Sequence, residues 1–316
     1  MVEPSALLAV AGRDWNHVMT RDRAIANASA CIAATLFGAS VVAVRIVVRD
    51  IPPLTLALLR FGQGAMLLLA GLALFRRDRL RIDPRDLPYL AFLGAIFFAV
   101  FPTTFNMGMR YEAASRGALL LATIPLWTLV IARLVSREQL NPRQILGVFV
   151  SVAGVAVVIL QRRAAGTGSV DIVRGDLLLL ITALCGAIYN VSAKRMLRKY
   201  GGLTVTFYAM LIGSLLLTPA LTVERLPSFS ALSAETVWLV IFLGVLGGAL
   251  AFSLWTSALR RLSPTQAAVY INLNPIAATL LAASVLHERL SSLFIVGFIG
   301  VAAGLMIVNW SPPLSS

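Results

Sequence analysis

Charged residues are scarce in this sequence. Only 13% of its 316 residues are Asp, Glu, Lys or Arg, whereas a soluble globular domain has about a quarter. Hydrophobic residues make up 59% of the chain and the mean hydropathy is +0.86. This composition excludes a water-soluble globular protein, and no stretch of the chain is polar enough to form a separate soluble domain.

Cysteine and histidine are almost absent, with two residues of each type. Cys31 and Cys185 lie in apolar stretches, where a small packing residue is a better interpretation than a disulfide or a metal ligand. The sequence also contains no phosphate-binding loop and no signature of a hydrolase, a zinc protease or a redox dithiol. We therefore expect no metal, no cofactor and no enzyme activity.

Acidic residues are missing from the middle of every apolar stretch. All fourteen Asp and Glu lie in the leader, in loops or at the ends of predicted spans. A proton-coupled pump needs an ionisable group near the membrane midplane, and an intramembrane aspartyl protease needs two acids there. Facilitated diffusion or exchange is the simpler expectation.

Apolar stretches of about 20 residues recur through the chain, and each is long enough to cross a bilayer as a helix. We predict an all-α integral membrane protein whose ten transmembrane helices follow a polar leader at residues 1–23. The predicted spans are 25–47, 53–75, 87–108, 114–134, 142–160, 174–196, 203–222, 234–258, 264–286 and 291–309.

The net charge of +13 does not indicate nucleic-acid binding, because the basic residues follow the topology. Lys and Arg are concentrated in the leader and in the even-numbered loops, most densely in Arg76–Arg85. Positive residues stay on the cytoplasmic side of a membrane. Both termini are therefore predicted to be cytoplasmic.

The chain repeats itself. When it is shifted by 150 positions, Met109–Leu160 aligns without a gap on Leu259–Trp310. The matched pairs are Arg110 with Arg260, Pro125 with Pro275, Glu138 with Glu288, Gly147 with Gly297, and Gly154 with Gly304. Hydrophobic residues match readily by chance, but a glutamate, a proline and two glycines in one register do not.

The repeat predicts two five-helix halves, at residues 24–160 and 174–310. Because five is odd, the second half enters the membrane from the opposite side. Inverted repeats of this kind are common in transporters, where two halves expose a midplane site to each side in turn.

The repeated glycines and prolines have local explanations. Gly147 and Gly154, like Gly297 and Gly304, share one face of a helix and allow another helix to approach closely. Packing within the chain is the expected role, and a contact in a dimer is the alternative. Pro125 and Pro275 each remove a backbone donor in the middle of a span, so we expect two symmetric kinks that serve a gate.

Three stretches resemble the EamA family of the drug/metabolite transporter superfamily: "FGASVVAVRIVVRDIPPLTLALLRF", "NMGMRYEAASRGALLLATIPLW" and "SALRRLSPTQAAVYINLNPIAATLL". The resemblance extends over both halves. It implies export or exchange of small metabolites such as amino acids, with both termini cytoplasmic. Phe37, where relatives often carry tryptophan, and Cys185 depart from the family pattern.

Polar and amphipathic residues inside the spans are the candidates for a transport path, because such groups are costly in a bilayer. They are Asn106, Trp127, Tyr189, Asn190, Trp255, Tyr270, Asn272 and Asn274. The alternative for each amide is a hydrogen bond between helices. Their distribution over both halves favours a central cavity.

Four arginines approach one side of the membrane: Arg45, Arg60, Arg110 and Arg116. Either nearby acids such as Asp50 and Glu112 neutralise them, or they attract anionic substrates. Arg60 lies deepest, about two turns into its span. We hypothesise that it stabilises an outer gate by a bond to Asp50.

The sequence therefore predicts an exporter or exchanger of small polar metabolites, such as amino acids, in a bacterial-type inner membrane. A carrier of anionic metabolites such as phosphorylated compounds is the alternative, and a membrane-embedded lipid enzyme is less favoured. The expected partners are a small-molecule substrate and the lipid bilayer, without nucleic acid. The protein is expected to be a monomer or a dimer.

Overall fold

The computed structural model describes residues 4–136, 142–164, 170–225, 228, 232–259, 270 and 273–309. Every regular element within those residues is helical. Seven segments are long and apolar enough to cross a membrane: Ala24–Val47, Pro53–Phe75, Pro84–Tyr111, Ala114–Val135, Val173–Ser192, Gly202–Val223 and Ala234–Ala258. Shorter apolar helices occupy Pro142–Val158, Leu273–Val285 and Ser292–Gly304. The chain is a multi-pass membrane protein.

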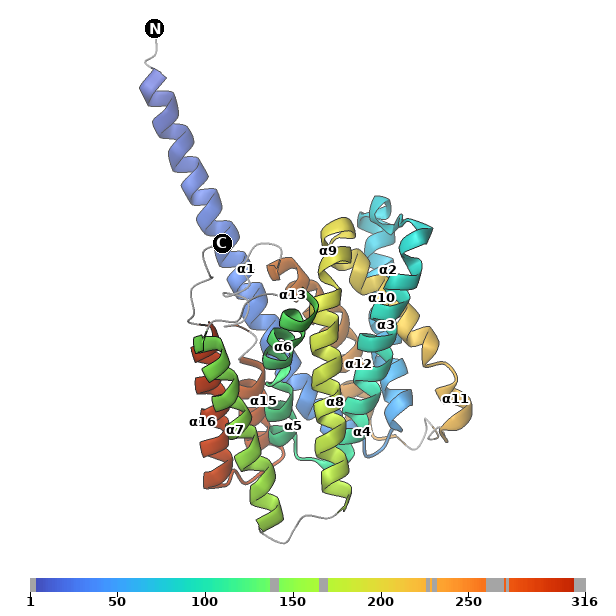
Figure 1. Ribbon diagram of the computed structural model, residues 1–316. Coiled ribbons are helices and arrows are strands. Elements are labelled where there is room, and N and C mark those ends of the chain that lie inside the picture. Colours follow the sequence, from blue (N-terminus) through green and yellow to red (C-terminus); the bar gives the residue numbers. More distant parts are fainter. Residues whose placement is uncertain are drawn as a thin grey trace.

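The first two helices meet at a proline pair. Helix α1 (Pro4–Val47) joins the leader and the first span in one helix of 44 residues, whose N-terminal part projects from the bundle (Figure 1). Helix α2 (Pro53–Phe75) begins at a proline, which loses nothing there because the first helical amide has no partner within the helix. Leu74 and Phe75 are 77% and 80% exposed, as expected for a surface that faces lipid.

The third span contains a π-helical turn. Helix α3 (Leu87–Gly94) runs into the π-turn η3 (Ala95–Val100), which continues as α4 (Phe101–Tyr111). Pro102 has no amide hydrogen for the carbonyl of Phe98, so regular α-helical bonding is interrupted at this point.

The eighth predicted span has the same construction. Helix α12 (Ala234–Gly244) runs into the π-turn η5 (Val245–Leu250), which continues as α13 (Ala251–Leu259). No proline follows this turn, which contains the pair Gly247–Gly248 instead. The two π-turns begin 150 residues apart, which is the spacing of the sequence repeat.

The fourth span is broken just before its proline. Helix α5 (Ala114–Leu121) ends, and α6 (Ile124–Ser136) begins after two turn residues. The hydroxyl of Thr123 donates to the carbonyl of Leu120 at 2.6 Å. The matching Pro275 is the third residue of α15 (Leu273–Val285).

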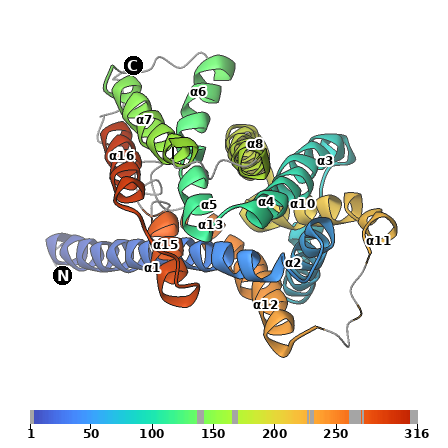
Figure 2. The same ribbon diagram turned by 90° about the horizontal axis from the view of Figure 1, so that it is seen from below.

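Helices α7 (Pro142–Ala164) and α16 (Ser292–Asn309) lie side by side (Figures 1 and 2). A Cβ on Gly154 would lie 2.7 Å from the carbonyl oxygen of Gly297, and a Cβ on Gly304 would lie 2.5 Å from that of Gly147. Low numbers in one helix meet high numbers in the other, so the two helices are antiparallel. The repeated glycines therefore bring the backbones of the two halves into contact.

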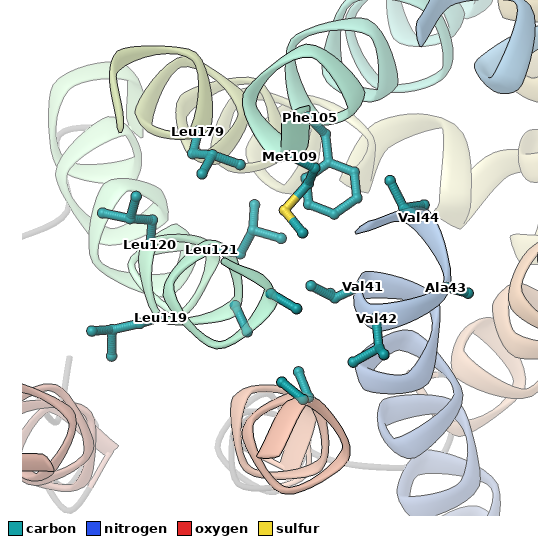
Figure 3. Packing of buried hydrophobic residues seen from close by; sticks show 14 of the residues in the cluster. Val41, Val42, Ala43, Val44, Phe105, Met109, Leu119, Leu120, Leu121 and Leu179 are labelled. Carbon is teal, nitrogen blue, oxygen red and sulfur yellow. The ribbon is translucent and has the colours of Figure 1, made fainter. Parts of the chain in front are cut away.

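The first half packs on the second through a shared core. The second half begins with α8 (Val170–Ser192), α9 (Lys194–Tyr200), α10 (Gly202–Leu216) and the short α11 (Ala220–Val223). Figure 3 shows Val41 of α1, Met109 of α4, Leu121 of α5 and Leu179 of α8 pointing toward one another. Phe105, beside Met109, reaches the same cluster.

Three carboxylates join the halves at one end of the bundle, which we name the far end. Glu224 accepts hydrogen bonds from the amides of Leu54 and Thr55, at the start of α2, at 3.1 and 2.7 Å. Glu288 accepts from the amides of Ala114 and Ser115, at the start of α5, at 2.7 and 3.1 Å. An anion suits a helix N-terminus because several amide donors are unpaired there.

The third carboxylate of the far end is Asp50, which accepts a hydrogen bond from the hydroxyl of Thr236 in α12. Each of these acids contacts the opposite half of the chain. The far end is therefore tied together by acceptors that satisfy helix starts and a hydroxyl, rather than by ion pairs alone.

The opposite end carries the basic stretch Arg76–Arg85, and we name it the basic end. Asp86 receives a hydrogen bond there from Lys199 and another from Tyr200. The hydrogen bond to Asp86 raises the pKa of Lys199 above its ordinary value. The hydroxyl of Tyr208 donates to the carbonyl of Leu80 at 2.6 Å.

Candidate functional site

A cavity of about 140 Å³ lies between the two halves. The first half contributes Phe37, Ser40, Val41, Arg60, Phe61, Phe97, Phe101, Phe105, Ala118, Leu121, Ala122, Ile124 and Pro125. The second half contributes Gly186, Asn190, Phe252, Trp255, Asn274 and Pro275. Pockets between helices that combine apolar walls with a few polar groups are typical small-molecule sites.

Aromatic rings form a large part of the described cavity wall. Phe252 meets Phe37 at a centroid distance of 5.0 Å and Phe98 at 5.6 Å. Phe97 stacks on Tyr189 at 4.1 Å with an interplanar angle of 15°. These contacts link α1, the π-turn η3, α8 and α13, so the rings hold the wall together as well as lining it.

Four polar side chains of the described residues reach the cavity. Ser40 donates its hydroxyl proton to the carbonyl of Leu36 at 2.8 Å, a local bond within α1. Asn190 lies 3.4 Å from the hydroxyl of Thr128, and Asn274 stands one residue before Pro275. Arg60 is the one basic residue in the described part of the lining.

Part of the predicted path lies at this cavity. Asn190, Trp255 and Asn274 line it, and so do Arg60, Pro125 and Pro275, which were expected to serve a gate. The structure therefore brings together both prolines and polar groups from both halves.

Other predicted path residues lie elsewhere. Tyr189 stands behind the wall, stacked on Phe97. Asn106 is 1% exposed and donates to the carbonyl of Pro53 at 2.8 Å, which ties α4 to the start of α2. Trp127 is 37% exposed and is not among the lining residues.

The ninth predicted span contains two further path residues. Tyr270 packs near Ala26, Ala30 and Ala258, against the N-terminal part of the first span in α1. Asn272 lies outside the described residues, as do Glu138 and Arg260 of the repeat.

Three of the four predicted arginines hold the backbone or an acid at the far end. Arg45 donates to the carbonyls of Met109 and Arg110, and Arg110 donates to that of Val48 at 3.3 Å. Arg116 lies 3.7 Å from Glu112 and 3.8 Å from Asp176, and it also donates to the carbonyl of Val158. These three side chains are structural in this conformation.

The expected bond between Arg60 and Asp50 is not formed. Asp50 instead accepts a hydrogen bond from the hydroxyl of Thr236, and it precedes α2 in the chain. Arg60 is seven residues into α2, and seven residues of helix rise by about 10 Å. The distance along the helix therefore separates a guanidinium at the cavity from an acid at the far end.

The aromatic wall of the cavity was not predicted from the sequence. Phe97, Phe101 and Phe105 recur every four residues, a spacing that places side chains on one face of a helix. In a chain that is 59% hydrophobic, such a stripe does not differ from a surface facing lipid. The repeat was the one further indication of an aromatic wall. It matches Phe105 with Trp255 at the offset of 150 residues, and both side chains line the cavity.

No group of three or more His, Cys, Asp or Glu within the described part of the chain is arranged to hold a metal ion. What the cavity can do is bind an organic molecule non-covalently, with apolar contacts on most sides. The described lining supplies one cation, two amides and one hydroxyl that can orient such a molecule.

Known proteins resemble this chain over most of its length. An "Uncharacterized transporter" of Archaeoglobus fulgidus is 26% identical over 87% of this chain and 93% of its own. A "Probable terminal-alkyne amino-acid exporter" of Streptantibioticus cattleyicolor is 29% identical over 81% of this chain and 83% of its own. A crystal structure at 20% identity superposes with a TM-score of 0.66 over 89% of this chain and 95% of that one, which supports the fold alone.

The family model for the EamA-like transporter family matches residues 24–160 and again residues 173–310. The two matches cover both halves that enclose the cavity. With its apolar helices and its relatives named as transporters, the chain belongs to the EamA-like transporter family of the drug/metabolite transporter superfamily.

Proposed function

We propose that this protein is a carrier that exports or exchanges small polar metabolites, such as amino acids or related compounds, by alternating access. The observation that carries the proposal is the cavity enclosed jointly by the two halves of the chain. A site between two halves can open to either side when the halves tilt against each other.

The proposal includes ten spans arranged as two inverted halves, residues 24–160 and 174–310, after a cytoplasmic leader. Two features of the described residues support it. The π-turns η3 and η5 begin 150 residues apart. Helices α7 and α16, which occupy matching places in the two halves, pack as an antiparallel pair.

The location follows from the charge pattern. We place the protein in a bacterial-type inner membrane with the basic end in the cytoplasm, because Lys and Arg are retained on that side. The far end then faces outward. Labelling of a single cysteine introduced at Arg79 from inside but not from outside intact cells supports this orientation, and the reverse pattern contradicts it.

The relatives support a carrier over an enzyme, because both curated relatives described above are named as transporters or exporters. The name of one of them, a probable terminal-alkyne amino-acid exporter, supports amino acids as a starting substrate class. A carrier of anionic metabolites is the second candidate, favoured by Arg60 in the cavity wall.

Counterflow in proteoliposomes tests the proposal. Vesicles are loaded with unlabelled amino acids or organic acids, and uptake of a trace of the labelled compound is followed. A carrier accumulates label transiently above equilibrium, whereas a channel reaches equilibrium only and an enzyme yields product. If no compound in the panel shows an overshoot with protein that is folded in detergent, the proposed function is wrong.

Two tryptophans provide a matched pair for this assay. Trp255 lines the cavity, and Trp127 does not. We expect Trp255→Leu to lower counterflow about tenfold, because contact with a large side chain is worth about 1.5–3 kcal/mol. Trp127→Leu should leave the rate within about twofold. Equal effects of the two substitutions would indicate a loss of fold and not of a binding surface.

A further inference from the structure

Arg60 is a buried cation with little to bind. Its side chain belongs to a residue that is only 8% exposed, and it reaches the cavity. One terminal nitrogen lies 3.5 Å from the carbonyl oxygen of Gly247, which is a long and weak hydrogen bond. The Nε atom has no hydrogen-bond partner within the described residues. The ring of Phe61, 5.0 Å from the guanidinium carbon, supports one face of the charge.

Among the described residues, no acid lies where it could neutralise this charge. The described part of the lining includes no Asp or Glu, and the three carboxylates that join the halves at the far end are engaged with helix starts or with Thr236. A guanidinium remains charged at any physiological pH, and burying it without an anion is costly. The far end shows that this chain supplies partners for arginines where the role is structural, as Glu112 and Asp176 do for Arg116. No carboxylate among the described residues partners Arg60 in this way, so an anionic ligand can take the position of the partner.

The rest of the lining sets the character of the ligand. Seven aromatic side chains of the described lining surround the cavity: Phe37, Phe61, Phe97, Phe101, Phe105, Phe252 and Trp255. A cavity of about 140 Å³ is close in size to an engineered protein cavity that holds benzene. The ligand therefore needs an apolar body about as large as one aromatic ring.

The number of charges decides between kinds of anion. A single guanidinium matches one carboxylate, which it can hold by two parallel hydrogen bonds. A phosphate ester carries up to two negative charges and would leave one of them uncompensated among aromatic rings. An amine would place a second cation near Arg60, and in the described lining only the side-chain oxygens of Ser40, Asn190 and Asn274 could accept its protons.

We infer that the cavity binds an organic monocarboxylate with an apolar, ring-sized body, with Arg60 holding the carboxylate and the phenylalanine wall enclosing the body. Transport of this ligand rests on the proposed function, but its binding does not. The two claims can therefore fail separately.

Calorimetric titration of the full chain in detergent tests the ligand class. The probes are 3-phenylpropanoate, its neutral analogue 3-phenylpropanol, the short acid propanoate and phenyl phosphate. We expect 3-phenylpropanoate to bind about tenfold or more tightly than each of the other three, because a hydrogen bond to a charged group is worth about 1.5–3 kcal/mol. Tighter binding of the alcohol or of phenyl phosphate would overturn the inference.

Substitution of Arg60 separates a ligand role from a structural one. Arg60→Met should weaken binding of 3-phenylpropanoate about 10- to 100-fold and leave that of 3-phenylpropanol within about threefold. Arg60→Lys, which retains the charge but loses the planar fork, should fall between Met and the wild type. Arg85→Met, which removes an exposed arginine at the basic end, is the control and should change nothing.

The stability of the empty protein gives an independent readout. Since removal of an unpaired buried charge relieves a cost, unliganded Arg60→Met should unfold at the same temperature as the wild type or higher. A lower unfolding temperature together with unchanged binding would overturn the inference and make Arg60 a structural residue. Binding without counterflow would count against the proposed carrier alone, and counterflow of other compounds without binding of 3-phenylpropanoate would count against this inference alone.

Discussion

The helix that contains η3 and the helix that contains η5 have the same backbone plan but very different side chains. Each has a π-turn of six residues at the same place in its half. The first turn carries Phe97 and Phe98, where the second carries Gly247 and Gly248. Bulky rings in one half thus correspond in sequence to bare backbone in the other.

This difference teaches what the repeat does and does not conserve. The backbone frame recurs, by which we mean the π-turns, the matched prolines and the glycines at the contact between α7 and α16. The cavity lining recurs only in part: Pro125 matches Pro275, but Arg60, Phe97 and Asn274 have Met210, Gly247 and Ile124 at the offset of 150 residues. A symmetric frame suits two equivalent ways of tilting the halves, whereas an asymmetric lining suits a ligand with a charged end and an apolar end.

The largest effect is expected where the first half uses a ring and the second a glycine. Phe98 is fully buried and contacts Phe61, Phe97 and Phe252. Phe98→Ala should destabilise the protein by about 3–5 kcal/mol, the cost of emptying a buried phenylalanine site. Unfolding in detergent measures it. Phe92→Ala on the exposed face of α3 is the control, and equal losses would contradict the assignment of Phe98 to the core.

A smaller effect is expected from Glu288, by which the second half caps a helix of the first. Glu288→Ala removes the acceptor for two amides and for the hydroxyl of Ser115. We expect a loss of about 1–2 kcal/mol, the usual worth of an N-terminal cap. Glu235→Ala removes an exposed acid from the first turn of α12 and should cost less. If the two variants unfold alike, the cap does not join the halves.

The smallest effect is expected when a methyl group is added to a glycine of the π-turn η5. A Cβ on Gly247 would lie 2.3 Å from the hydroxyl oxygen of Ser40. Gly247→Ala should therefore cost about 1 kcal/mol, because crowding is partly offset by the better helix propensity of alanine. Removing that hydroxyl in the double variant Gly247→Ala/Ser40→Ala should restore wild-type unfolding. Persistence of the loss would mean that the backbone, and not Ser40, is crowded.

The sequence predicted the seven long apolar segments of the described structure, and it named part of the lining of the candidate cavity. Hydropathy alone placed a helix at 53–75, where α2 lies, because an apolar run bounded by a proline pair and by arginines has few other structures in lipid. Arg60, Asn190, Trp255 and Asn274 were found because polar or amphipathic side chains contrast with their surroundings.

What the sequence could not give was orientation around each helix. Asn106 was expected in the path, but its amide holds the carbonyl of Pro53. Phe97 and Phe101 were not expected there, because an apolar residue in an apolar helix does not indicate which way it faces. The π-turns were not predicted either, because their sequences "AIFFAV" and "VLGGAL" are both apolar and share no pattern that distinguishes them from an α-helix.

The turn at Ala95–Val100 also fixes the rotational phase of the helix that follows it. A π-turn accommodates one residue more than an α-helix would over the same length. Deleting a single residue there would return the span to a continuous α-helix and rotate everything beyond it by about 100°. Phe101 and Phe105 would turn away from the cavity, although no lining residue had been changed. In this span, the residue count is as much a determinant of the binding surface as the residues themselves.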